Sequence, residues 1–170
     1  VNVFNVAFIA MGSATAIIIG RKLGEWGESR TKELKNEAWR LMLFYCFLCM
    51  LSSTLMIVVS FVFPKIYNTT NEIRALATGL IILMAAYMPI HSFNNASYFI
   101  IRSGGKTFIT FLFDSCFCWA VSIPAAYFLA HYTRVPILPM YAAVISCELV
   151  KVVIGITLVN KGIWIKNITV

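Results

Sequence analysis

The residues best suited to bind a ligand recur at helical spacing within one apolar stretch, 73–101. Met84, Met88, His91, Asn95 and Tyr98 are three or four positions apart, so they share one helix face, and Tyr87 and Asn94 lie beside it. Polar groups at membrane depth are tolerated where they face other protein or a water-filled cavity. We expect these seven residues to line a cavity. Ordinary packing between helices is the alternative.

A second group of candidate residues is ionisable and lies inside two later apolar stretches: Asp114, Glu148 and Lys151. A charge at the bilayer centre costs at least ~2.5–3.5 kcal/mol, so these residues need partners. In an antiparallel hairpin, Asp114 and Lys151 would lie roughly 9 and 13 Å from the same end, an offset that a lysine side chain covers. We predict an Asp114–Lys151–Glu148 cluster, which either clamps the helices or couples transport to a proton or cation.

Other chemistry has little support in the sequence. We find no HExxH motif and no paired catalytic acids, so no catalytic residue, metal site or cofactor is predicted. Gly105-Lys106-Thr107 resembles the end of a phosphate-binding loop, but its first glycine is replaced by Ile100 and no strand precedes it. The five cysteines all fall in apolar stretches and are predicted to be packing residues: Cys46, Cys49, Cys116, Cys118 and Cys147.

The elements that must position these residues are membrane-spanning helices. The 170 residues are 60% hydrophobic, and five apolar segments are each about as long as the ~20 residues needed to cross a bilayer. The expected spans are 3–20, 39–63, 73–101, 108–130 and 140–160, within one transmembrane helical domain, 1–170. The fold class is therefore an all-α membrane protein with five transmembrane helices. Because Val1 begins inside an apolar segment, we expect the chain to be a fragment with further helices upstream.

Two prolines inside the spans are candidate hinges. Pro89 leaves the carbonyl of Ala85 without its usual donor, and Pro124 does the same for Ala120. Pro64 is expected to close the second span.

The basic residues predict the orientation of the chain. One side of the membrane would carry ten of them, Arg21, Lys22, Arg30, Lys32, Lys35, Arg40, Arg102, Lys106, Lys161 and Lys166. The other side would carry only Lys65, Arg74 and Arg134, so the first side, including the C-terminus, is expected in the cytoplasm. Trp164 is expected to be an interfacial anchor. The net charge of +7 thus reflects topology and anionic lipid rather than nucleic acid.

Several motifs together resemble one transporter family. They comprise Gly20-Arg-Lys-Leu-Gly-Glu-Trp-Gly27 ahead of a charged helix, Arg102-Ser-Gly-Gly-Lys-Thr107, Asp114-Ser115, Trp119, Pro124-Ala-Ala-Tyr127, Tyr141, Glu148, Lys151 and Gly162-Ile-Trp-Ile-Lys-Asn167. Their order and spacing are similar to those of the MATE (multidrug and toxic compound extrusion) transporters. The resemblance covers nearly the whole chain.

The resemblance implies a fold of twelve helices in two six-helix bundles, of which this chain would supply helices eight to twelve, nearly all of the second bundle. It implies a secondary antiporter in the cell membrane that exports cationic or amphipathic drugs in exchange for Na⁺ or H⁺ by alternating access. Some members use carboxylates on helices seven and ten. Here helix ten offers His91, Asn94 and Asn95 but no acid, so coupling is expected in the missing N-terminal bundle.

Two alternatives remain open from the sequence. A lipid-linked oligosaccharide flippase of the same superfamily would be expected to have a more cationic cavity. A structural membrane subunit without transport activity is also compatible with five spans.

Overall fold

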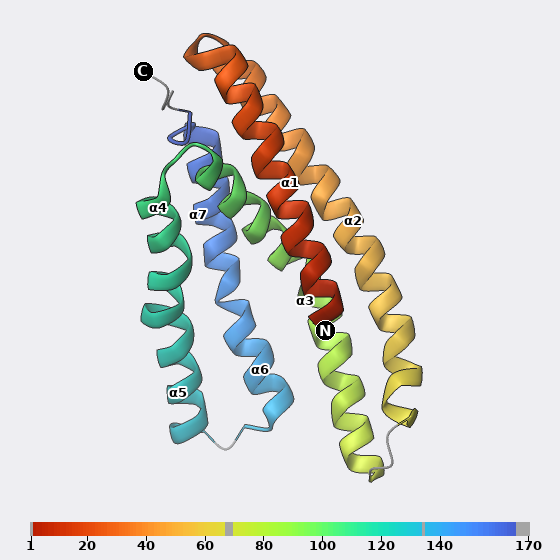
Figure 1. The fold of residues 1–170 in the computed structure, drawn as a ribbon. Helices are drawn as coiled ribbons and strands as arrows, with labels where there is room; N and C mark the ends of the chain where they lie inside the picture. The colour runs from red at the N-terminus through yellow and green to blue at the C-terminus, as the bar shows by residue number, and fades with distance from the viewer. Residues whose placement is uncertain (1, 67–69, 134, 166–170) are drawn as a thin grey trace.

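The computed structural model describes residues 2–66, 70–133 and 135–165, and within this part of the chain it contains helices and no strand. The helices are α1 (Asn2–Trp26), a 3₁₀ turn η1 (Gly27–Arg30), α2 (Thr31–Ile66), α3 (Asn71–Ser103), α4 (Thr107–Phe111), two π-helical stretches η2 (Leu112–Cys116) and η3 (Cys118–Ser122), α5 (Ile123–Tyr132), α6 (Ile137–Ser146) and α7 (Glu148–Lys161). Joined end to end, they form the five long helical segments of Figure 1.

Four of these segments are long and apolar enough to cross a membrane: Thr31–Ile66, Asn71–Ser103, Thr107–Tyr132 and Ile137–Lys161. The chain is therefore a multi-pass membrane protein. The expected span at 3–20 lies inside α1 and stays a prediction.

Two boundaries differ from expectation. α2 does not end at Pro64 but continues to Ile66, and the last segment is interrupted at Cys147 between α6 and α7.

α3 is the central helix of the bundle. It contacts α1 and α2 on one side and α4, α6 and α7 on the other, and Figure 1 shows it crossing between the two groups. Large apolar side chains cover the outside, among them Ile17, Phe47, Leu51, Val62, Phe128 and Val153. Such a surface is costly in water and suits contact with lipid tails.

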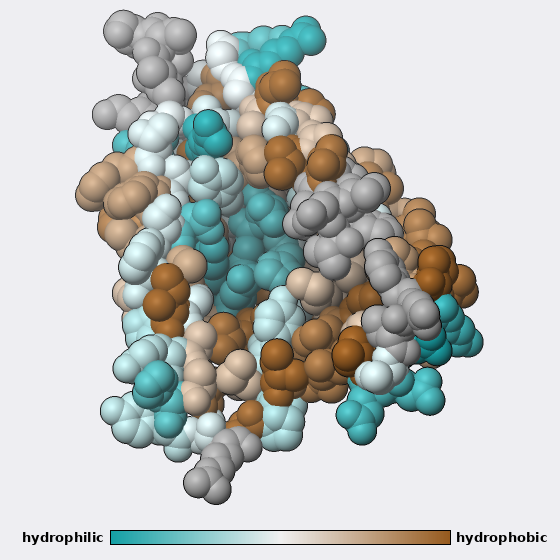
Figure 2. Space-filling model, turned by 60° about the horizontal axis from the view of Figure 1, so that its bottom comes forward, coloured by the Kyte–Doolittle hydropathy of each residue, from teal (hydrophilic) through white to brown (hydrophobic). Residues whose placement is uncertain are grey.

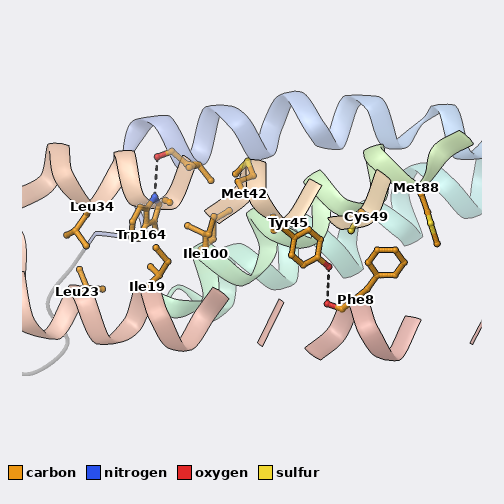
Figure 3. Close-up of a cluster of buried hydrophobic side chains, with 14 of the residues drawn as sticks. Phe8, Ile19, Leu23, Leu34, Met42, Tyr45, Cys49, Met88, Ile100 and Trp164 are labelled. Atoms are coloured by element: carbon orange, nitrogen blue, oxygen red, sulfur yellow. Dashed lines mark hydrogen bonds between the residues drawn. The ribbon is translucent and has the colours of Figure 1, made fainter. Parts of the chain in front are cut away.

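The main apolar core lies where α1, α2 and α3 meet the end of α7. Trp164 is fully buried there, and its indole Nε1 donates a hydrogen bond to the carbonyl of Val159 at 3.1 Å (Figure 3). The expected interfacial anchor at Trp164 is thus wrong. Gly162 takes a left-handed conformation (φ 70°) that ends α7 and returns the chain toward the bundle.

Two carbonyls released by prolines, those of Ala85 and Ser60, find partners on neighbouring helices. The hydroxyl of Ser53 donates to the carbonyl of Ala85 at 2.7 Å, so α3 stays continuous across Pro89. The hydroxyl of Thr78 lies 3.4 Å from the carbonyl of Ser60, four residues before Pro64. Two packed helices thereby stabilise each other's irregular turns.

Gly104 offers a test of the packing around Trp164. A Cβ atom at Gly104 would lie 1.8 Å from the main-chain oxygen of Trp164, whereas one at Gly24 would meet nothing within 4 Å. We expect Gly104→Ala to lower the free energy of unfolding by about 1–3 kcal/mol through overpacking. Thermal unfolding in detergent micelles measures this, with Gly24→Ala as the matched control. Equal stability of the two variants would contradict the observed packing.

Ser53 offers a test of the proline compensation. Ser53→Ala should leave the buried carbonyl of Ala85 without a donor and cost about 1–3 kcal/mol. The neighbouring Ser52 bonds only within its own helix, to Leu48, so Ser52→Ala is the control and should be nearly neutral. Chemical unfolding in micelles compares the two, and a larger loss for the Ser52 variant would disprove the assignment.

Candidate functional site

A polar cavity of about 280 Å³ lies between α3, α7, η2 and the first part of α1. It is lined by Ile9, His91, Asn94, Asn95, Tyr98, Phe99, Asp114, Glu148 and Lys151. The space-filling view in Figure 2 shows a hydrophilic hollow between more apolar walls. Glu148 lies roughly 16 Å and 20 Å from the two ends of its helical segment at 1.5 Å per residue, so the cavity is near mid-membrane depth.

The predicted stripe on α3 divides into two parts. His91, Asn94, Asn95 and Tyr98 line the cavity together, as the helical spacing implied. The other three residues lie elsewhere: Met88 is in the apolar core, Met84 packs against that core, and the Tyr87 hydroxyl is 2.7 Å from that of Ser146. These three are not among the residues that line this cavity, and a substrate-binding role for them stays a prediction.

Glu148 supplies the acid that α3 lacks. Its Oε2 lies 3.0 Å from Nδ1 of His91 and accepts a hydrogen bond from the amide of Asn94 at 3.2 Å. The same amide lies 3.3 Å from the main-chain oxygen of Glu148. Glu148 directly follows Cys147, the residue at which α6 passes into α7.

Sequence reasoning missed the meeting of Glu148 with the stripe, although a signal existed. Glu148 lies roughly 20 Å along α7 from its last residue, Lys161. His91 lies roughly 18 Å along α3 from its last residue, Ser103, at the same basic side of the bundle. The equal depth made contact possible. Equal depth does not determine how each helix is rotated about its own axis. Whether the two side chains face each other could therefore be seen only in the packed structure.

The predicted pair of Asp114 and Lys151 forms. Lys151 Nζ donates to Oδ1 of Asp114, and the lysine ammonium also lies 5.2 Å from the ring centre of Phe113. The Lys151 side chain is 11% exposed and that of Asp114 57%, so the lysine is the more deeply placed member. The expected three-residue cluster is therefore two adjacent pairs, Asp114–Lys151 and His91–Glu148.

A second cavity, of about 390 Å³ and of mixed polarity, lies on the other side of these pairs. It is lined by Asp114, Ser115, Phe117, Cys118, Trp119, Ser122, Val144, Ile145, Glu148 and Lys151. Much of its wall comes from the π-helical stretches η2 and η3, a backbone form that often marks functional sites. The predicted hinge residue Pro124 directly follows them, in the first turn of α5.

One polar atom beside the cavity has no hydrogen-bond partner. The Oδ1 atom of Asn94 is buried without a hydrogen-bond partner, so it is an acceptor that a ligand could use. In the described part of the chain, no group of three or more His, Cys, Asp or Glu side chains could hold a metal ion. The five cysteines are all free thiols.

The comparison with protein families decides the class of the molecule. The family model described as MatE matches residues 1–128. The chain belongs to the MatE family. Membership implies MATE-type transport and places the chain in a family of transporters that are not enzymes. No curated protein and no solved structure matches the chain. In this MatE chain, α6 and α7, with Glu148 and Lys151, follow the matched region.

The Asp114–Lys151 pair predicts a specific pattern of stabilities. Asp114→Asn should strand the deeply placed Lys151 charge and destabilise the protein by about 1–3 kcal/mol, because the lysine loses its carboxylate partner. Replacing both residues, by Asn and Met, should recover most of that loss, since no unpaired charge remains. Unfolding in micelles of the wild type, both single variants and the double variant measures the coupling. Additive losses would show that the pair contributes no coupling.

Proposed function

We propose that this chain is part of a secondary active antiporter that exports cationic or amphipathic compounds across the plasma membrane in exchange for Na⁺ or H⁺. The single observation that carries the proposal is the Glu148 carboxylate, held at mid-membrane depth in a polar cavity between two helices. An ionisable group at this depth is costly and marks ion or substrate pathways. The coupling carboxylate would thus come from α7, rather than from the N-terminal bundle of the twelve-helix fold that the family resemblance implies.

The cavity wall has the chemistry that an amphipathic cation requires. Tyr98 and Phe99 form a close aromatic pair with ring centres 5.4 Å apart, and both line the cavity. Aromatic faces attract cations, and an apolar body can lie against them and Ile9. The unpartnered Oδ1 of Asn94 adds an acceptor beside the carboxylate.

Alternating access is supported by an asymmetry between the two ends of the bundle. At the end that carries most basic residues, the core around Trp164 closes the space between α1, α2, α3 and α7. Figure 2, which brings the opposite end forward, shows the hydrophilic hollow open to view. The distribution of Lys and Arg would put the closed end in the cytoplasm, giving an outward-open form. Pro89 and Pro124 are the proposed hinges.

The alternatives fit the cavity less well. A flippase of lipid-linked oligosaccharides would use cationic groups to hold a pyrophosphate-bearing substrate, but two carboxylates here face one lysine and one histidine. A structural subunit would use the two ion pairs only to join helices and does not require the polar cavity that they line. The proposal includes further transmembrane helices of the same protein, which would complete the twelve-helix fold.

The substrate role of the cavity can be tested by efflux. In cells that lack their own exporters, the full-length protein with His91→Ala and Asn95→Ala should export ethidium at least about tenfold more slowly, since each removes a polar cavity wall group. His131→Ala is the control, because His131 stacks on Tyr127 in α5 and is not among the residues that line the cavity. Unchanged efflux by the double variant, at equal expression, would count against the proposal.

A further inference from the structure

We propose that a groove between α1 and α2 binds an anionic phospholipid, with one acyl chain along the groove and the phosphate held by Arg21 and Arg40. The groove has a volume of about 110 Å³ and is lined by Met11, Ala14, Thr15, Ile18, Leu41, Phe44, Tyr45 and Leu48. Figure 1 shows the two helices side by side from the turn that joins them. This site is separate from the polar cavity and does not depend on the proposed transport function.

The groove is apolar, although two of its residues carry hydroxyl groups. The hydroxyl of Thr15 donates a hydrogen bond to the carbonyl of Met11 at 2.9 Å, and that of Tyr45 donates to the carbonyl of Phe8 at 2.9 Å. Both hydroxyls are therefore satisfied within the protein. Both residues are buried and form the floor of the groove, whereas Phe44 is exposed at its rim. Such a groove suits an aliphatic chain and offers a polar ligand no free hydroxyl.

The groove has the length of one leaflet of a bilayer. It ends at an ion pair between Lys22 of α1 and Glu37 of α2, with 2.9 Å between the charged atoms. The pair lies one turn beyond the last groove residue of α1 and one turn before the first of α2. From Arg21 to Met11, α1 rises roughly 15 Å at 1.5 Å per residue, which is half of the ~30 Å hydrocarbon core. An acyl chain that starts at the ion pair would thus reach the middle of the membrane along the groove.

Two arginines lie at the end of the groove that faces the basic side of the bundle. Arg21 is seven residues after Ala14, and Arg40 is four residues before Phe44, so each is on the groove side of its helix. Their side chains are 79% and 78% exposed. One nitrogen of each guanidinium contacts a glutamate, and the remaining N–H groups can donate to a phosphate, whose geometry the planar guanidinium matches.

The charged groups at this end carry a surplus of one positive charge. Arg21 pairs with Glu25 at 2.7 Å, while Lys22 and Arg40 share Glu37 at 2.9 and 3.5 Å. Three cations therefore meet two carboxylates, and one phosphodiester would neutralise the surplus. Exposed ion pairs are weak, so a phosphate can compete with the glutamates for the arginines. On the orientation expected from the Lys and Arg residues, this end lies in the cytoplasmic leaflet, where anionic lipids attract basic residues.

The headgroup contacts can be tested by native mass spectrometry of the full-length protein, stripped of lipid in detergent. Phosphatidylglycerol and phosphatidylcholine with identical acyl chains are added in equal amounts. The wild type should retain one phosphatidylglycerol with a preference of about tenfold or more, because the arginines attract its net negative charge. The double variant Arg21→Gln with Arg40→Gln should lose this preference. Both side chains are on the surface, so the variant should fold as the wild type does.

A matched control removes the same charge elsewhere on the same side of the bundle. Lys32 and Lys161 are exposed, and the double variant Lys32→Gln with Lys161→Gln should keep the preference for phosphatidylglycerol. Lys32 lies nine residues before Leu41, which puts it on the opposite side of α2 from the groove, and Lys161 ends α7. Equal loss in the two double variants would show attraction to net charge alone and would overturn the proposed site.

The groove is tested without any change of charge. Ala14→Phe should fill it and abolish retention of both lipids, and Ala14→Leu, a smaller change, should weaken retention of both. Replacement of Phe44 by p-benzoylphenylalanine should, on illumination in liposomes that contain phosphatidylglycerol, attach a phospholipid to α2.

Three further results would overturn the proposal. They are a preference for phosphatidylglycerol that persists without Arg21 and Arg40, unchanged lipid retention in both Ala14 variants, and attachment of the Phe44 photoprobe to another helix of the protein instead of to lipid. Because no efflux is measured, each of these results leaves the proposed transport function to its own test.

Discussion

The bilayer supplies no water to unpaired polar groups, and this constraint shapes the whole structure. The two ion pairs and the carbonyls of Ala85 and Ser60 are each matched by a group on another helix. The hydroxyl of Ser53 in α2 donates a hydrogen bond to the carbonyl of Ala85 in α3. The amide of Asn94 in α3 donates to the carboxylate of Glu148 in α7, and the ammonium of Lys151 in α7 donates to Asp114 in η2. Because α3 takes part in two of these contacts, it holds the bundle together as well as lining the cavity.

The irregular stretches of backbone gather around the two ion pairs. Asp114 lies in the π-helical stretch η2, Glu148 follows the interruption at Cys147, and His91 follows Pro89. Irregular turns within a span are tolerated where the freed groups face protein or a cavity. Trp164, in contrast, is fully buried in the apolar core, in the turn that follows α7. The structure thus combines a well-packed end with irregular backbone in the middle of the membrane.

The helices, their apolar faces and their buried charges follow from the sequence alone. Hydropathy and helical spacing depend on residue types along the chain, so they predicted the all-α membrane class, the cavity face of His91, Asn94, Asn95 and Tyr98, and the Asp114–Lys151 pair. The motifs from Gly20 to Asn167 likewise indicated the family, which the match over residues 1–128 shows.

Only the tertiary structure decided which side chains face one another across helices. It placed Glu148 against His91, moved Met88 into the core, and buried Trp164 where flanking lysines suggested an exposed anchor. Helical periodicity gives depth and relative angle within one helix, but not the rotation of that helix against its neighbours. That rotation is fixed by packing, including the close approach of Gly104 to the chain at Trp164, and it has no local signature in the sequence.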